Sequence, residues 1–300
     1  MTSNRVVVVT GASRGIGRGT ALALGACGDT VYVTGRGMTQ ATGKWQGTLA
    51  DTAAEITRRG GKGIAVACDH ADDGQTKALF EQVQREQGRI DVLVNNAFGM
   101  PDSASSPGKY WERSLDLWHS TIDIGLRSSY VASYYAIPMM IRQNRGLIVF
   151  TSGPGANRHM HPLPYGVGKV GHDKLAHDIA HEVVPHNVAT LSFWHGLVRT
   201  DRTIEAMKLS PEWVKASGGE QVTETPEFGG RIIDAAWRDA DLMKISGSTF
   251  WTAELAEHYG VMDADGQKPV SRRAKYGAPI FGPASGFDPS NSFLDWDKKK

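Results

Sequence analysis

The sequence predicts an α/β fold, with a doubly wound, mostly parallel sheet of seven strands between two layers of helices. Short runs of β-branched residues alternate with longer stretches of helical periodicity up to about residue 195, which is the pattern of βαβ units. The predicted strands are almost continuously apolar, as strands covered by helices on both faces must be. A glycine-rich turn follows the first strand, and sheets of this kind bind ligands at the carboxyl ends of their strands.

Each predicted strand is a short apolar run, and the first contains the four consecutive valines of residues 6–9. Six strands are predicted, at Arg5–Thr10, Thr30–Thr34, Gly63–Cys68, Ile90–Asn95, Gly146–Thr151 and Val188–Trp194. A seventh is expected at Ser248–Thr252. Five helices lie between the first six, at Gly15–Cys27, Leu49–Gly60, Asp72–Gln87, Tyr110–Gln143 and Pro164–Pro185. Pro138 is expected to kink the fourth helix, because its ring disturbs the preceding turn.

One catalytic domain is expected over residues 1–260, because no Pro/Ser-rich linker or charge break divides the alternating pattern. Residues 201–229 are different, since prolines and glycines surround short amphipathic pieces there. Long excursions of this kind are commonly lids or binding loops, so we interpret them as a substrate-binding lid. Residues 261–300 are rich in Gly, Pro, Ser and Lys and are expected to form an extended tail.

Composition limits the possible partners and compartments. The 33 Lys and Arg against 32 Asp and Glu give a net charge of +1, which provides no general attraction for nucleic acid or an anionic membrane. Cys27 and Cys68 are too few for a disulfide framework or a cysteine-based metal site, which favours a reducing compartment. We find no signal peptide and no apolar run of about 18 residues, and therefore expect a soluble, cytoplasmic protein.

The turn after the first strand reads Thr10-Gly11-Ala12-Ser13-Arg14-Gly15-Ile16-Gly17. Its glycines permit a tight strand-to-helix turn and a close approach of backbone N–H groups to a pyrophosphate at a helix N-terminus. We therefore predict that Gly11, Ser13, Arg14, Gly15, Ile16 and Gly17 hold a dinucleotide. A glycine-rich turn alone is weak evidence, and an ordinary turn is the competing interpretation.

The ends of the next strands indicate which dinucleotide is bound. The second strand ends in Thr34-Gly35-Arg36, with no carboxylate to bind a ribose 2′-hydroxyl, so Arg36 and Arg14 favour NADP(H) over NAD(H). Asp69 and His70 follow the third strand, where the adenine would lie, although Asp69 or Asp72 could simply cap the next helix. Asn95 and Ala97 at the end of the fourth strand are further cofactor candidates.

Three side chains form the strongest catalytic candidate. Ser152 follows the fifth strand, and Tyr165 and Lys169 lie four residues apart, on one face of the next predicted helix. Reduction of a carbonyl needs a proton donor for the oxygen, and a tyrosine whose pKa is lowered by a neighbouring ammonium can serve. The hydroxyl of Ser152 can hold the same oxygen. Because Tyr-x-x-x-Lys also occurs by chance, the order of all these features carries the prediction.

In this order, the features resemble the short-chain dehydrogenase/reductase family over about residues 5–260. Segments similar to its dehydrogenase/reductase member 1 subgroup are Tyr32–Arg36, Gly125–Arg127, Pro164–Lys169 and Asp173–Ala176. The resemblance implies a Rossmann-type sheet, NADP(H), hydride transfer between a carbonyl and an alcohol, and a homodimer or homotetramer. By that likeness Tyr165 is the general acid/base, Lys169 binds the nicotinamide ribose and Ser152 orients the substrate. Asn95 would help to hold the cofactor, and Val198 and Thr200 match residues that meet its carboxamide.

The chain departs from the family pattern at two positions. Gly125 stands where many members have an asparagine that supports the proton relay, although the subgroup also has glycine there. His195 stands where the family usually has proline, and is either a titrating group near the pocket or a structural histidine.

Other candidates are weaker. His159, His161 and Trp213 could line the substrate site together with His195. His177 and His181 have a spacing that zinc accepts, but no third ligand is evident, so no metal is expected.

These observations favour an NADP(H)-dependent oxidoreductase that interconverts a ketone or aldehyde and an alcohol, acting on a hydrophobic or aromatic small molecule. A cofactor-binding regulator without turnover is the alternative. Such a sensor needs only the glycine turn and Arg36, so the presence of Ser152, Tyr165 and Lys169 argues against it. An epimerase or dehydratase of the extended relatives would need a separate C-terminal domain, for which about 100 residues after Thr200 leave little room.

Overall fold

The computed structural model describes residues 4–99, 101, 108–160, 162–216, 218–219 and 223–284. Seven strands form one sheet: β1 (Val6–Thr10), β2 (Thr30–Gly35), β3 (Lys62–Ala67), β4 (Val92–Asn95), β5 (Gly146–Ser152), β6 (Val188–Trp194) and β9 (Thr249–Trp251). Their order is β3-β2-β1-β4-β5-β6-β9, and every neighbouring pair is parallel. The predicted doubly wound sheet is therefore confirmed.

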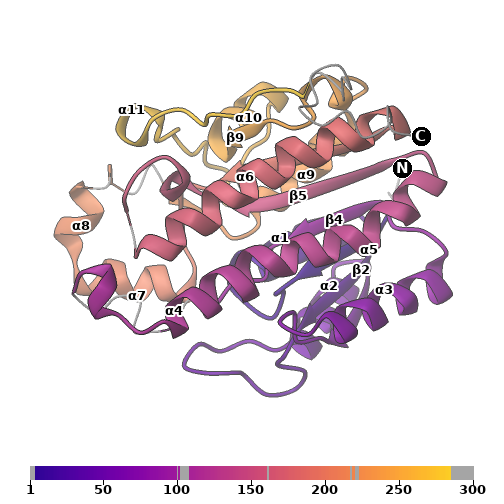
Figure 1. Ribbon diagram of the computed structural model, residues 1–300, viewed down its shortest axis with the longest axis horizontal. Helices are drawn as coiled ribbons and strands as arrows, with labels where there is room; N and C mark the ends of the chain where they lie inside the picture. Colours follow the sequence, from indigo (N-terminus) through magenta and orange to yellow (C-terminus); the bar gives the residue numbers. More distant parts are fainter. Residues whose placement is uncertain are drawn as a thin grey trace, which may run out of the picture.

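Helices cover both faces of this sheet, and Figure 1 looks onto the side of α6. The main helices are α1 (Gly15–Gly25), α2 (Leu49–Arg58), α3 (Asp73–Gln87), α5 (Ser128–Arg142), α6 (Leu163–Val183), α9 (Phe228–Arg238) and α10 (Thr252–Tyr259). Alternate valines of β1 serve two cores: Val7 and Val9 pack with α1, α2, α9 and α10, whereas Val6 and Val8 pack with α3, α5 and α6. The strands are buried on both sides, which explains their continuous apolar character.

The long helix predicted over Tyr110–Gln143 is not one regular helix. The structure has a 3₁₀ turn, η2 (Tyr110–Glu112), then α4 (Asp116–Trp118), a π-helical stretch, η3 (His119–Arg127), and finally α5. Arg113 is extended, and the Ser114 hydroxyl accepts from the Asp116 N–H at 3.2 Å, so a local side-chain bond competes with the helix. Pro138 lies inside α5, which continues to Arg142.

The proposed lid segment begins with two exposed helices, α7 (Asp201–Leu209) and α8 (Pro211–Ala216). Every residue of α7 is at least partly exposed. Beneath them, β7 (Leu197–Val198) and β8 (Thr223–Glu224) form a separate two-stranded sheet. This part of the chain is thus attached to the main sheet through β7, directly after β6.

Residues after 260 contact several parts of the fold, and only their last described stretch reaches β9. They include α11 (Arg273–Tyr276). Backbone hydrogen bonds join Thr249 N–H to Phe281 C=O at 3.0 Å and Ala284 N–H to Ser246 C=O at 2.8 Å. The segment 277–284 therefore runs beside β9 at the end of the sheet. In the part of the chain that is described, no helix has the length and apolar character needed to cross a membrane.

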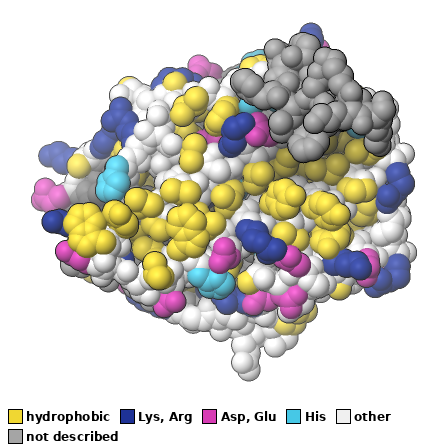
Figure 2. Space-filling view, in the orientation of Figure 1, with side chains coloured by type: hydrophobic (Ala, Val, Ile, Leu, Met, Phe, Trp, Pro, Cys, Tyr) yellow, Lys and Arg dark blue, Asp and Glu magenta, His cyan; other side chains and the backbone are white. Residues whose placement is uncertain are grey.

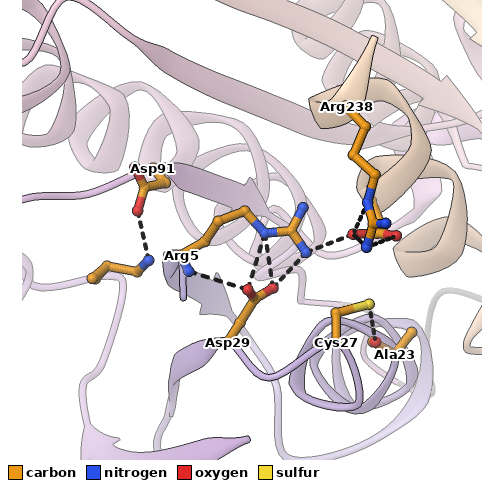
Figure 3. Close-up of polar contacts among 8 residues, drawn as sticks. Arg5, Ala23, Cys27, Asp29, Asp91 and Arg238 are labelled. Atoms are coloured by element: carbon orange, nitrogen blue, oxygen red, sulfur yellow. Dashed lines mark hydrogen bonds and ion pairs between the residues drawn. The ribbon is translucent and has the colours of Figure 1, made fainter. Parts of the chain in front are cut away.

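Charged side chains meet at the amino ends of the strands (Figure 3). Arg5, just before β1, donates to both carboxylate oxygens of Asp29, just before β2, at 2.6–3.0 Å. It also donates to Asp234 of α9 at 2.8 Å, and Asp91 accepts from the Val6 N–H at 2.7 Å. Arg5 and Asp29 are almost fully buried. The charges at this edge of the sheet are therefore paired with one another.

Candidate active site

The glycine turn lies at the carboxyl end of β1. Its backbone conformation and close contacts disfavour side chains at its glycines. Gly11 and Gly15 have φ values of +66° and +58°, which glycine adopts without strain. A Cβ at Gly17 would stand 2.3 Å from Asn96 Nδ2 and 2.4 Å from Gly11 O. Asn96 itself donates to Gly11 O at 3.0 Å. The turn is thus held in shape by an amide from the end of β4.

The two neighbouring asparagines, Asn95 and Asn96, have different surroundings. Asn95, predicted to hold the cofactor, is fully buried and donates to Ser133 Oγ at 3.0 Å. Asn96 instead holds the glycine turn and lines the cleft beside it. Strand alternation explains the difference, because successive side chains point to opposite sides.

A cleft of about 300 Å³ opens at this edge of the sheet. It brings together Gly11, Ser13, Arg14, Gly15, Ile16, Arg36, Asp69, His70, Ala97 and Thr200, all predicted from the sequence. Thr10 is paired with Thr34 across β1 and β2, which places the glycine turn next to Arg36. The cleft is therefore continuous across the carboxyl ends of β2, β1 and β4.

The two residues after β3 have distinct surroundings. The Asp69 carboxylate accepts from Ala71 N–H at 3.1 Å, whereas Asp72 is the N-cap of α3. His70 is buried, and its Nε2 lies 2.7 Å from Thr34 Oγ1. Burial lowers the pKa of His70 to about 4, so its imidazole is neutral at pH 7.

Trp45 and Arg202 are two of the cleft residues that were not predicted from the sequence. Trp45 comes from the loop between β2 and α2, and Arg202 from the first turn of α7. The guanidinium of Arg202 lies 5.9 Å from the centre of the Trp45 ring. Arg14 donates to the Trp45 carbonyl at 3.0 Å. No motif marks these positions, because they are far apart in the sequence and meet only in the fold.

The predicted catalytic side chains come together at the end of β5 and the start of α6. Ser152 Oγ donates to the Lys169 carbonyl at 3.0 Å, and Lys169 Nζ donates to the Thr151 carbonyl at 2.9 Å. The ammonium lies 5.5 Å from the centre of the Tyr165 ring and 4.5 Å from that of Phe98. Phe98, at the end of β4, also makes an edge contact with Tyr165 and lines the cleft.

Burial controls the ionisation of this group. It raises the pKa of Tyr165 to about 12, opposite to the lowering expected from the sequence, and lowers the pKa of Lys169 to about 8, because both charged forms lose water. Asp173, one turn beyond Lys169, is also buried and accepts from Ser192 Oγ at 2.6 Å and Trp194 Nε1 at 2.8 Å. Burial raises the pKa of Asp173 to about 6. Its charge favours the ammonium form of Lys169.

A model of the short chain dehydrogenase family matches residues 5–209. The chain belongs to the short-chain dehydrogenase/reductase family. It is similar to dehydrogenase/reductase SDR family member 1 of Mus musculus, with 42% identity over 274 residues covering 89% of this chain and 85% of the relative. The Homo sapiens protein of that name is 40% identical over 276 residues, with the same coverage. The predicted family and subgroup are thus confirmed.

Solved structures of this family share the fold. One is a putative short-chain alcohol dehydrogenase from Sinorhizobium meliloti 1021, with a TM-score of 0.69, 25% identity, and coverage of 83% of this chain and 95% of that one. As a short-chain dehydrogenase/reductase, the protein is an oxidoreductase that uses a nicotinamide cofactor. Its own residues fit that group, because Gly11 and Gly15 of the glycine turn line the same cleft as Arg14 and Arg36, and these two guanidinium groups can bind phosphate.

Gly125, where many short-chain dehydrogenases/reductases have asparagine, lies in the π-helical stretch η3. A Cβ there would lie 2.9 Å from Phe98 Cδ2, so glycine allows Phe98 to reach Lys169. The Gly125 carbonyl accepts from Ser129 Oγ at 3.1 Å and lies 3.3 Å from His172 Nε2. Burial lowers the pKa of His172 to about 3. The neutral side chains of Ser129 and His172 therefore both lie within hydrogen-bond distance of the Gly125 carbonyl oxygen.

The second departure, His195, lies beneath the lid. It is buried, its Nδ1 is 3.3 Å from Glu224 Oε2, and its ring packs on Gly229. The structure does not place it among the residues of the cleft. Glu224 also accepts from Gly196 N–H at 2.7 Å. The pair therefore joins the end of β6 to the lid strand β8, as a structural histidine would.

The remaining substrate candidates are dispersed. His159 is exposed and lines a small cavity of about 200 Å³ with Gly155 and Gly166, the neighbours of Tyr165. His161 and the side chain of Trp213 lie outside the described residues. His177 Nε2 is 3.3 Å from His181 Nε2. Among the described residues, no group of three His, Cys, Asp or Glu side chains could hold a metal.

Proposed function

We propose that the protein is an NADP(H)-dependent carbonyl reductase that interconverts a ketone or aldehyde and an alcohol. The observation that carries this proposal is the grouping of Ser152, Tyr165 and Lys169. Tyr165 and Lys169 contact Phe98, which lines the cleft together with Arg14 and Arg36. A nicotinamide bound in that cleft supplies or accepts the hydride.

The chain itself supplies the proton. Tyr165 is protonated at neutral pH, since burial holds its pKa near 12, so its hydroxyl can donate to the oxygen that gains charge when a carbonyl is reduced. Lys169 stabilises the resulting tyrosinate, because an ammonium close to the ring favours the charged form. Ser152, at the end of β5, offers a second hydrogen bond to the same oxygen.

The preference for NADP(H) rests on charge. β2 ends in Gly35 and is followed by Arg36, with no carboxylate to bind a 2′-hydroxyl or repel a 2′-phosphate. Arg36 is exposed in the cleft, and Arg14 lines the same wall. Guanidinium groups bind phosphate with two parallel hydrogen bonds, so this wall suits a 2′-phosphate.

The lid supports a hydrophobic or aromatic substrate. Its helices α7 and α8 line a groove of about 490 Å³ with the apolar residues Ile204, Met207, Pro211 and Val214, and three cations, Arg199, Lys208 and Lys215, lie around it. Largely apolar pockets with a few polar groups are typical of small-molecule sites. The groove follows Thr200 and Asp201 directly along the chain, and both of these line the cofactor cleft.

We further propose that the protein works in the cytoplasm as a homodimer or homotetramer. Figure 2 shows a band of hydrophobic side chains across the face on which α6 lies. Tyr130 and Tyr134 of α5 and Leu163 and Val167 of α6 are exposed by 38–62%. Exposed apolar side chains in such number favour a protein partner, and a second copy would supply a matching face.

The test follows the absorbance of the reduced cofactor with a panel of ketones, aldehydes and quinones. We expect consumption of NADPH in preference to NADH, and Tyr165→Phe should lower kcat by about 10²- to 10⁴-fold while NADPH binding persists. Tyr130→Phe, on the exposed face of α5, is the matched control and should leave kcat unchanged. Tight NADPH binding without turnover on any carbonyl would favour a regulator instead.

A further inference from the structure

Three arginines from separate parts of the chain line one cleft. Arg14 precedes α1, Arg36 follows β2 and Arg202 lies in the first turn of α7. The pKa of Arg14 is lowered by burial and by the positive charges of Arg202 and Arg36. Two carboxylates, Asp69 and Asp201, line the cleft as well, and the first of them accepts from Ala71 N–H. The wall therefore carries an excess of positive charge.

The loop between β2 and α2 holds two of these arginines close together. Arg14 donates to the carbonyls of Thr42 and Trp45 at 3.3 and 3.0 Å, and Arg202 lies over the Trp45 ring. The indole Nε1 of Trp45 is buried and has no hydrogen-bond partner within the described ranges. A donor without an acceptor is costly when buried, so an anionic oxygen beside Trp45 would be stabilised.

The same loop contacts both the glycine turn and α7. A Cβ at Gly47 would lie 2.4 Å from Ser13 O, so the loop rests directly on the glycine turn. At its other contact, Lys44 Nζ pairs with Glu205 Oε1 of α7 at 2.6 Å. The loop thus connects the cofactor turn to the first helix of the lid.

We propose that Arg202 is a third ligand of the cofactor 2′-phosphate, beside Arg14 and Arg36. This inference rests on the proposed NADP(H) preference and adds a residue from the lid to it. Bringing three guanidinium groups together costs electrostatic energy that a phosphate near the dianionic state offsets, whereas the neutral 2′-hydroxyl of NAD(H) does not. A phosphate also offers three acceptor oxygens for separate donors.

The position of Arg202 gives this contact a second effect. Because no residue of α7 is fully buried, few buried contacts hold it, and a bond from Arg202 to the phosphate would fix its first turn. The groove that we propose for the substrate is lined in part by residues of α7. Binding of NADP(H) would thereby order the substrate site more than binding of NAD(H).

The experiment measures the dissociation constants of NADPH and NADH by nicotinamide fluorescence for wild type, Arg202→Gln and Arg36→Gln. Arg58→Gln, an exposed arginine of α2, is the control. We expect Arg202→Gln to weaken NADPH binding by about tenfold, as expected for loss of a charge-assisted hydrogen bond, and to leave NADH binding and the control unchanged.

Two results would overturn the assignment of Arg202. Equal loss for NADPH and NADH would place it on the shared pyrophosphate, and no loss for either would make it structural. If Arg36→Gln abolishes the NADPH preference but Arg202→Gln does not, the inference fails and the proposed function stands. If wild type shows no preference for NADPH, the proposed cofactor itself is wrong.

Discussion

Charged side chains are arranged differently at the two edges of the sheet. At the amino edge, Arg5 is enclosed by Asp29 and Asp234, and Asp91 accepts a backbone N–H (Figure 3). At the carboxyl edge, Arg14 and Arg36 lie near a third arginine instead. A buried cation depends on its carboxylate partners, because loss of a partner leaves an uncompensated charge, whereas cations gathered with their own kind favour an anion. The difference separates structural charges from functional ones, although both flank the same strands.

The largest expected effect comes from removing a charge at the amino edge. Asp29→Asn leaves Arg5 almost fully buried with one partner fewer, and removal of one member of a buried ion pair costs about 3 to 5 kcal/mol. Urea unfolding should show this loss, while NADPH binding to the folded fraction stays unchanged. An equal loss of cofactor affinity would mean that the two edges are not independent.

The next effect concerns the carboxyl edge. Gly17→Ala places a Cβ 2.3 Å from Asn96 Nδ2 and 2.4 Å from a backbone oxygen, so the turn must shift. Overpacking of this kind costs about 1 to 3 kcal/mol, and we expect cofactor affinity to fall by about 100-fold in a fluorescence titration. Gly282→Ala is the control, because no described atom lies within 4 Å of its added Cβ. Unchanged cofactor binding in Gly17→Ala would show that the turn tolerates a side chain.

A smaller effect concerns how the free energy of unfolding depends on pH at the carboxyl edge. His70, at the carboxyl edge, has a pKa lowered by burial to about 4, against about 6.5 in the unfolded chain. Its contribution to stability is therefore present above pH 6.5 and lost as the pH falls towards 4, because the unfolded state takes up the proton first. Asp173 acts in the opposite sense, since its pKa is raised to about 6.

Replacing His70 removes only its own contribution. In His70→Gln the fall in unfolding free energy between pH 7 and 5 should be smaller by about 2 kcal/mol. Denaturant unfolding at both pH values provides the measurement, and exposed His258→Gln serves as control. An unchanged slope in His70→Gln would show that this histidine is accessible to protons in the fold.

The smallest expected effect comes from the ion pair that joins the loop between β2 and α2 to α7. Lys44 and Glu205 are exposed by 55% and 40%, and exposed ion pairs contribute about 0 to 1 kcal/mol. Lys44→Met should change the unfolding free energy by less than about 0.5 kcal/mol and NADPH affinity by less than about twofold. A large loss of affinity would show that the loop, rather than Arg202, holds the lid in place.

The strands and the grouping of the candidate catalytic side chains were predictable because both follow from local patterns. β-branched runs identify the strands, and the spacing of Tyr165 and Lys169 places both on one face of α6, where the structure finds them together. The glycine turn was predictable for the same reason, since its φ values require glycine.

Features that depend on tertiary contacts were not predictable. The interruption before η3 arises from an extended Arg113, in a stretch whose apolar periodicity is still helical. Asn95 was chosen over Asn96 because the sequence does not reveal which side of a strand end faces the cleft. Arg202 and Trp45 meet across more than 150 residues, and Asp173 owes its surroundings to two side chains of β6.

The strip of backbone beside β9 has a practical consequence for anyone who shortens this chain. A strand at the border of a sheet offers unpaired amide and carbonyl groups to other molecules, and such borders nucleate aggregates. Residues 277–284 occupy that position through the bonds of Thr249 and Ser246. Truncation before residue 277 would remove this segment and leave the edge of β9 free to pair with other molecules. We expect such a variant to precipitate at high concentration while the side chains of Ser152, Tyr165 and Lys169 stay in place.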